Sequence, residues 1–109
     1  MSQPVKLIAL LKAKPGMSLS DFEKRWIGDH APLTLKFKNL KAYRINVAIE
    51  EYQEIEGDLP FDGIAELWWD SLEQMQEDFA SPEAEAAVAD ADTFTVIRTH
   101  IYCREFVLK

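Results

Sequence analysis

The sequence predicts a single α+β domain whose elements follow in the order β-α-β-β-α-β. Four segments carry the residue pattern of strands, and two carry that of helices, each helix lying between two of the strands. The 109 residues fit the usual size of one domain, and 48% hydrophobic with 28% charged residues is close to the globular average. We therefore expect residues 1–109 to form one domain around one core.

The first strand is expected over residues 5–12, a short aliphatic run with little alternation. A Lys-Pro-Gly turn at residues 14–16 ends it. Ser18 stands three residues before Asp21, which is the spacing of a helix cap in which a hydroxyl accepts a backbone N–H. A helix is therefore predicted to begin here.

The first helix has one apolar face, because Phe22 and Trp26 are four residues apart. Gly28 and Pro32 are expected to end it, since proline disfavours a helical conformation in the residue before it. This pattern predicts that His30 lies in a broken stretch just beyond the helix end.

The middle of the chain predicts two strands joined by a long, solvated connection. Apolar residues alternate with mixed ones over residues 43–49, as in a strand with one buried face. Residues 50–62 contain six acidic side chains with one glycine and one proline, which is typical of a loop. The next strand, residues 63–69, is expected to turn Ile64, Glu66 and Trp68 to one face.

The second helix is predicted to open at Ser71 and to restart at Ser81 and Pro82, and a last strand follows over residues 95–107. Four strands and two helices in this order fit a ferredoxin-like fold with a four-stranded antiparallel sheet and both helices on one face. The first and third strands are apolar on both faces, so the second face also needs cover. We expect a homodimer formed through these sheet faces.

Charge and composition limit the kinds of partner and the cellular location that we expect. The chain has 12 basic and 19 acidic residues, a net charge of −7, which disfavours nucleic acid and anionic membranes. The apolar run near the N-terminus, residues 7–11, is too short for a signal peptide or a membrane span. Cys103 is the single cysteine, which fits a reducing compartment. These features together predict a cytoplasmic protein.

One stretch carries a family resemblance. The run KPGMSLSDF at residues 14–22, followed by Trp26 and by DHAPL at residues 29–33, resembles the EthD family of dimeric α+β barrel proteins. Residues 81–83 and Phe94 also fall where that family tends to have them. The resemblance implies a ferredoxin-like dimer with a pocket between the helices and the sheet. Members of the family include cofactor-independent oxygenases or dehydratases of polyketide anthrones and a methyl-lactone isomerase.

Three residues are candidate catalytic groups: His30, Tyr43 and Glu66. His30 suits a general acid or base because imidazole changes charge near neutral pH, although a histidine at a helix end also serves as a cap. Tyr43 matches a tyrosine of the isomerase, and it would either polarise a substrate oxygen or pack in the core. Leu67 stands where that enzyme has a cysteine, which counts against isomerisation. Glu66 is a carboxylate in an apolar strand, with an arginine partner as the alternative role.

Aromatic side chains suit a flat apolar ligand, and the candidate binding residues are Phe22, Trp26, Trp68 and Phe79. Two distant histidines and one cysteine form no recognised metal-ligand spacing, and no phosphate-binding glycine motif is present, so we expect neither metal nor cofactor. Haem binding would require His30 or His100 as an axial ligand. His100 is otherwise expected at an interface or on the surface.

These observations favour a cofactor-independent enzyme, an oxidoreductase, lyase or isomerase, that acts on a small aromatic or polyketide-like molecule with His30 as acid or base. Oxygenation, dehydration and isomerisation stay open. The alternative is a non-catalytic module that binds a hydrophobic small molecule, in which His30 only stabilises the helix end.

Overall fold

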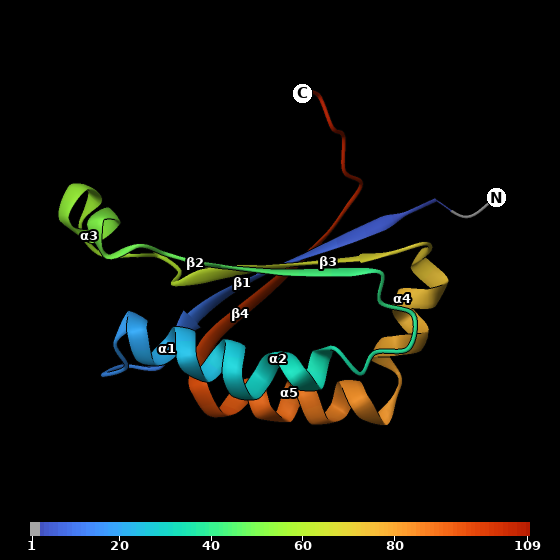
Figure 1. The fold of residues 1–109 in the computed structure, drawn as a ribbon, viewed down its shortest axis with the longest axis horizontal. Coiled ribbons are helices and arrows are strands. Elements are labelled where there is room, and N and C mark those ends of the chain that lie inside the picture. Colours follow the sequence, from blue (N-terminus) through green and yellow to red (C-terminus); the bar gives the residue numbers. More distant parts are fainter. Residues whose placement is uncertain (1–2) are drawn as a thin grey trace.

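In the computed structural model, four strands form one antiparallel sheet in the order β2-β3-β1-β4, and helices cover one of its faces (Figure 1). The structure describes residues 3–109, so Met1 and Ser2 of the predicted domain lie outside the described residues. This order confirms the predicted ferredoxin-like class. The elements are β1 (Val5–Ala13), α1 (Leu19–Arg25), a π-helix (Trp26–His30), α2 (Ala31–Thr34), β2 (Ala42–Val47), α3 (Glu50–Glu56), β3 (Gly63–Trp69), α4 (Leu72–Phe79), α5 (Pro82–Phe94) and β4 (Thr95–Cys103).

The predicted helix starts are confirmed by their capping bonds. A serine precedes α1, α4 and α5, and its hydroxyl accepts a hydrogen bond from the backbone N–H three residues further on, at 3.0, 3.2 and 3.3 Å. These serines are Ser18, Ser71 and Ser81. The restart of the second helix at Ser81 separates α4 from α5.

The predicted end of the first helix at Gly28 and Pro32 is wrong. The chain stays helical to Thr34, passing from α1 through the π-helix into α2. Because Pro32 has no N–H, the Gly28 carbonyl lacks its α-helical donor, and the ladder widens by one residue so that the Ala31 N–H bonds to the Trp26 carbonyl. His30 therefore lies inside a helical segment and caps no helix end.

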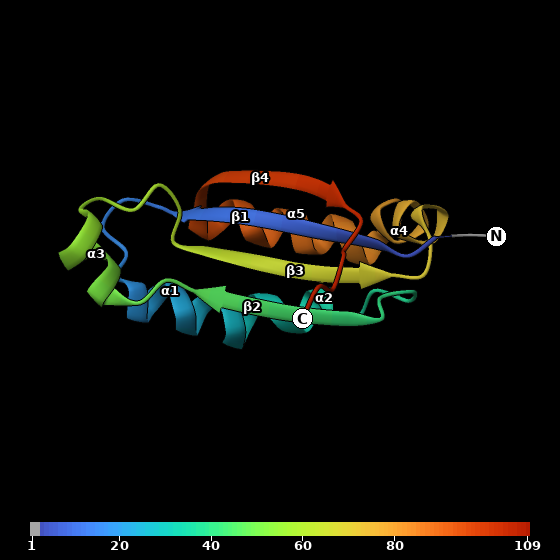
Figure 2. The same cartoon turned by 90° about the horizontal axis from the view of Figure 1, so that it is seen from above.

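The connection between β2 and β3 also differs from its prediction, because it contains the helix α3. Glu50 and Glu51 lie in its first turn, where negative charge favours the helix dipole, and Gly57 ends it at φ +87°. Figures 1 and 2 show α3 at one end of the molecule, and Figure 1 shows it outside the layer formed by α1, α2 and α5. None of the helices within residues 3–109 has the length and apolar character needed to cross a membrane.

The core lies between the sheet and the helices. In β3 the odd-numbered side chains are buried while Ile64, Glu66 and Trp68 face the other side, as predicted. The largest fully buried side chains include Trp26, Trp69 and Phe22. The opposite sheet face has no helix over it, and the segment after β4 rises above that face (Figures 1 and 2). The last strand ends at Cys103, short of the predicted residue 107.

Candidate functional site

A cavity of about 70 Å³ lies between the inner face of the sheet and the helices. Its lining is mostly apolar, with aromatic rings from Trp26, Phe37 and Phe79. The remaining side chains around it are polar and come from four different elements: His30, Thr34, Tyr43, Arg98 and His100. A small apolar space with a few convergent polar groups is the usual composition of a ligand site.

Small residues open this space within the core. Ala9 of β1 pairs with Ala65 of β3 at the middle of the sheet. Ala87 and Ala91 of α5 also line the cavity. Four facing side chains that end at Cβ leave room that larger residues would fill, since protein cores are otherwise close-packed. The small residues of α5 therefore help to form the cavity.

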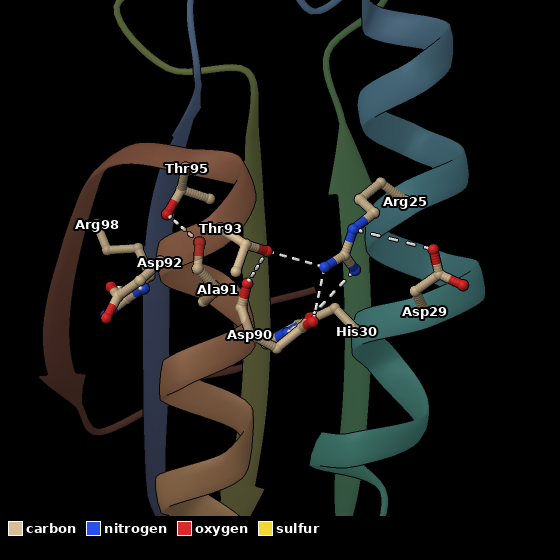
Figure 3. A network of polar contacts seen from close by, with 9 residues as sticks. All are labelled: Arg25, Asp29, His30, Asp90, Ala91, Asp92, Thr93, Thr95 and Arg98. Atoms are coloured by element: carbon tan, nitrogen blue, oxygen red, sulfur yellow. Dashed lines mark hydrogen bonds and ion pairs between the residues drawn. The ribbon is translucent and has the colours of Figure 1, made fainter.

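His30 is held by the carboxylate of Asp90 on α5, with 3.0 Å between His30 Nδ1 and Asp90 Oδ2. Arg25 binds the same carboxylate through two nitrogens, at 2.6 and 3.1 Å, and also donates to the Thr93 hydroxyl at 2.9 Å. Figure 3 shows these contacts joining the helical segment around His30 to the last turns of α5. We call them the Arg25–Asp90–His30 network.

Burial and the network together determine the charges of His30 and Asp90. Burial lowers the pKa of His30 below its ordinary 6.5 and outweighs the raising effect of Asp90. The bonds from Arg25 lower the pKa of Asp90, so this carboxylate is ionised and only accepts hydrogen bonds. At neutral pH Nδ1 of His30 must therefore carry the hydrogen, and Nε2 keeps a lone pair that accepts a proton.

Tyr43 lies in β2 opposite Leu67 of β3 and lines the same cavity. Burial raises the pKa of its hydroxyl, and the neighbouring side chains of Thr34 and Trp26 offset only part of that effect. The phenol is therefore protonated across the physiological range and is available as a hydrogen-bond donor.

His100 and Arg98 bring two basic side chains to the cavity from β4. The sequence predicts His100 at an interface or on the surface. In the structure its side chain is partly exposed to solvent, and its ring lies 6.3 Å from that of Phe79. Burial, with a smaller effect of Arg98, lowers the pKa of His100. Arg98 forms an ion pair with Asp92 at 2.8 Å.

Two predicted site residues lie on the opposite face of the sheet. Glu66 forms an ion pair with Lys6 at 2.8 Å and accepts a hydrogen bond from Asn46 at 3.0 Å. Trp68 donates to Glu105 at 3.1 Å, and the Lys6 ammonium lies 4.5 Å from the centre of its ring. Strand alternation separates both from the cavity, so the proposed site leaves Glu66 and Trp68 out.

The other predictions divide between cavity and core. Trp26 and Phe79 line the cavity, as expected of binding residues. Phe22 is fully buried beside them, with its ring 5.1 Å from that of Trp26 and 5.8 Å from that of Phe94, and does not line the cavity. Phe22 therefore belongs to the core and packs against Trp26, which lines the cavity.

Sequence reasoning missed Asp90, the partner of His30. The residue lies on α5 between Ala87 and Phe94, both buried, so its spacing places a carboxylate at the edge of the buried stripe. This position next to buried residues was the feature of the sequence that could have indicated a partly buried carboxylate. The neighbouring Asp29 is largely exposed and lies 3.9 Å from Arg25. No group of three His, Cys, Asp or Glu side chains suited to a metal ion occurs within residues 3–109.

Comparison with known proteins gives one family and a set of shared folds. A family model described as the EthD domain matches residues 14–97. An ethyl tert-butyl ether D (EthD) family protein from Bacillus halodurans C-125 is 27% identical with a TM-score of 0.78, and the match covers 95% of this chain and 100% of that one. No curated protein matches the chain.

More distant structures share the fold. A hydroxynitrile lyase from Passiflora edulis is 15% identical, with a TM-score of 0.72 and 94% of each chain covered. SnoaB, described as a cofactor-independent oxygenase from Streptomyces nogalater, is 10% identical with a TM-score of 0.69, and 99% of this chain and 100% of that chain are covered. Two further structures, 16% and 15% identical, are described as dimeric with a ferredoxin-like fold.

Proposed function

This chain belongs to the EthD domain family, and on that premise we propose that it is an enzyme that moves a proton on a small apolar molecule, with His30 as the acid or base. The observation that carries the proposal is a neutral imidazole, oriented by Asp90, at the wall of an apolar cavity. Groups with perturbed pKa and a specific charged partner, placed in a cleft, are typical of catalytic sites.

The proposed chemistry starts with proton removal from a carbon next to a carbonyl group. The proton passes to Nε2 of His30, and Asp90 stabilises the imidazolium that forms. The electron pair of the broken C–H bond forms a C=C bond, and the π electron pair of the carbonyl group moves onto its oxygen, to which the Tyr43 hydroxyl donates a hydrogen bond. Oxygenation of the carbanion, dehydration and isomerisation all follow from this first step, so each remains a proposed overall reaction.

Cavity size limits the proposed substrate. About 70 Å³ is well below the roughly 300 Å³ or more of pockets that enclose drug-sized ligands. A molecule with a single ring is therefore a better fit than a polyketide of several rings. Larger aromatic compounds would require Phe79 and His100 to move apart at the open side, where His100 is exposed.

Exchange of ketone hydrogens in D₂O tests the first step of the proposed reaction on simple model compounds. Cyclohexanone and anthrone serve as probes of different size, and NMR follows loss of the hydrogens next to the carbonyl. His30→Gln keeps the polar bulk and removes the base, so exchange should fall by about 10²–10⁴-fold. Glu66→Gln, on the opposite face of the sheet, is the control and should retain most of the exchange.

The outcome separates the enzyme from the binding module. If wild-type protein binds the ketones but exchanges no hydrogens, or if His30→Gln exchanges at the wild-type rate, the proposed acid/base role is wrong. Ligand binding without exchange would favour the module that only holds a hydrophobic molecule.

We also propose that the protein is a homodimer in which the uncovered sheet faces meet. Ile64, Ile97 and Ile101 are 37–50% exposed on this face, close to the ion pairs of Lys6 with Glu66 and Glu105. An apolar patch rimmed by charged side chains is typical of a protein–protein interface. The structures described as dimeric share this fold and support the proposal.

A further inference from the structure

We infer that the indole N–H of Trp26 holds an oxygen of the bound molecule, so that the cavity selects ligands with a carbonyl, enolate or phenolate oxygen. The inference deepens the proposed function and rests on its assignment of this cavity as the ligand site. It adds a ligand class and a specific donor to that assignment.

The Trp26 N–H is a buried donor without a partner. The residue is 0% exposed and lines the cavity, and its Nε1 atom has no hydrogen-bond partner in the described part of the chain. The other two tryptophans differ: Trp69 donates to Asp78 at 2.6 Å and Trp68 donates to Glu105 at 3.1 Å. A buried donor left unpaired destabilises a protein, so its presence beside a cavity points to a partner that enters from outside.

Packing fixes the direction of the indole ring. Its Cζ3 and Cη2 atoms lie so close to the backbone of Gly63 that a Cβ at this position would collide with them. The ring of Phe22 packs 5.1 Å away at a tilt of 42°. The six-membered edge is thus held against β3, and the N–H edge has little freedom to turn toward another partner.

Other donors lie near the same point. As hydrogen-bonding neighbours, the Trp26 and Thr34 side chains lower the pKa of the Tyr43 hydroxyl, but the Trp26 N–H and that hydroxyl do not reach the distance and angle of a formed hydrogen bond. All three side chains line the cavity. A carbonyl oxygen has two lone pairs, so it can accept from the indole and from the phenol at once.

The position of Trp26 relative to His30 gives the donor a chemical role. The two residues are the first and last of the π-helix, and both side chains are buried and line the cavity. When His30 removes a proton from the neighbouring carbon, negative charge develops on the oxygen. A fixed donor in a water-poor site stabilises that charge more strongly than it stabilises the neutral carbonyl, because it needs no reorganisation.

A matched pair of ligands isolates the contribution of the oxygen. Cyclohexanone and methylenecyclohexane have similar shapes, but only the ketone accepts a strong hydrogen bond. We expect cyclohexanone to shift the Trp26 indole N–H signal in ¹⁵N–¹H NMR spectra and the alkene to leave it nearly unchanged. Trp26→Phe should weaken ketone binding by about tenfold and leave alkene binding within about twofold, as expected for one hydrogen bond.

Trp68→Phe is the control, because the Trp68 indole lies on the other sheet face and donates to Glu105. This variant should bind both ligands as the wild type does. The wild-type NMR titration keeps the test valid if Trp26→Phe does not fold. The inference is overturned if both ligands shift the Trp26 signal equally, if the ketone binds without shifting it, or if neither ligand binds up to its solubility limit.

The test also distinguishes this inference from the proposed function. His30→Gln should bind cyclohexanone and shift the Trp26 signal while losing hydrogen exchange. Binding at Trp26 without exchange in the wild type contradicts the acid/base proposal alone. Exchange that depends on His30 but leaves the Trp26 signal unmoved contradicts this inference alone.

Discussion

The imidazole of His30 is subject to two opposing influences, and burial prevails. Desolvation lowers its pKa, the bond to Asp90 raises it, and the net result is a value below 6.5. The capping role considered from the sequence would require His30 at a helix end, whereas its Nδ1 bonds to a carboxylate on α5. Its surroundings therefore keep the imidazole neutral.

This balance predicts how stability depends on pH. His30 takes up its proton near pH 6.5 in the unfolded chain and only at lower pH in the folded protein. Between its folded-state pKa and 6.5 the unfolded state therefore binds more protons. The contribution is fully present above 6.5 and is lost as the pH falls toward the folded-state pKa. Urea unfolding at pH 7.5 and 5.5 should show this loss in the wild type.

His30→Gln should reduce the difference in stability between the two pH values. His100 also has a lowered pKa, so His100→Gln measures its separate share. An unchanged difference in His30→Gln would contradict the assignment of a lowered pKa to His30.

Asp90 should affect the rate of proton transfer more than ligand binding. Asp90→Asn removes the charge that stabilises the imidazolium and that fixes the hydrogen on Nδ1, so exchange of ketone hydrogens should fall by roughly 10²-fold or more. The affinity for cyclohexanone should change little. Asp92→Asn, on the same helix and paired with Arg98 at 2.8 Å, is the control; equal losses in both variants would argue against the orienting role of Asp90.

At the scale of the elements, the π-helix and the close approach of Gly63 position the site. Gly63→Ala would drive a Cβ into the Trp26 ring and the Asn46 carbonyl. We expect a loss of about 1–3 kcal/mol in unfolding free energy, as for overpacked cores. Gly28→Ala is the matched control because, apart from the adjacent backbone of its own helix, no atom lies within 4 Å of its added Cβ. This substitution should be neutral or stabilising. Similar effects of both substitutions in thermal unfolding would contradict this packing account.

Periodicity and capping predicted most of these elements, because both are local properties of the chain. Ser18 and Ser71 marked the helix starts, and alternation in β3 separated Leu67 from Glu66 correctly. The connection predicted over residues 50–62 does join the paired strands β2 and β3. Its first part is helical and not a loop, because acidic residues also favour a helix N-terminus, as Glu50 and Glu51 do in α3.

The site was predicted only in part, because its decisive contacts link distant segments. His30, Tyr43, Trp26 and Phe79 do line one cavity. The bond between His30 and Asp90 spans 60 positions and depends on how α5 packs, which spacing within a helix does not reveal. The helix break predicted at Pro32 was wrong because a π-helix absorbs the missing N–H without ending the segment.

For the whole molecule, the uncovered sheet face is the feature that a single chain does not explain. Exposed isoleucines there predict a dimer with twice the chain's mass of 12.5 kDa in sedimentation at micromolar concentration. Ile101→Glu places a charge in that face, where Ile101 pairs with Ile8 across β1 and β4, and should give the single-chain mass. A wild-type protein that sediments at 12.5 kDa would contradict the dimer.

The pH dependence of ketone hydrogen exchange tests the central claim, proton transfer by His30, most directly. The rate should rise with pH to a plateau, with its midpoint below 6.5, because only neutral His30 accepts the proton. The same titration of His30→Gln should show a low rate with no midpoint in this range. A midpoint that persists in His30→Gln, or wild-type exchange no faster than in buffer, would contradict the account.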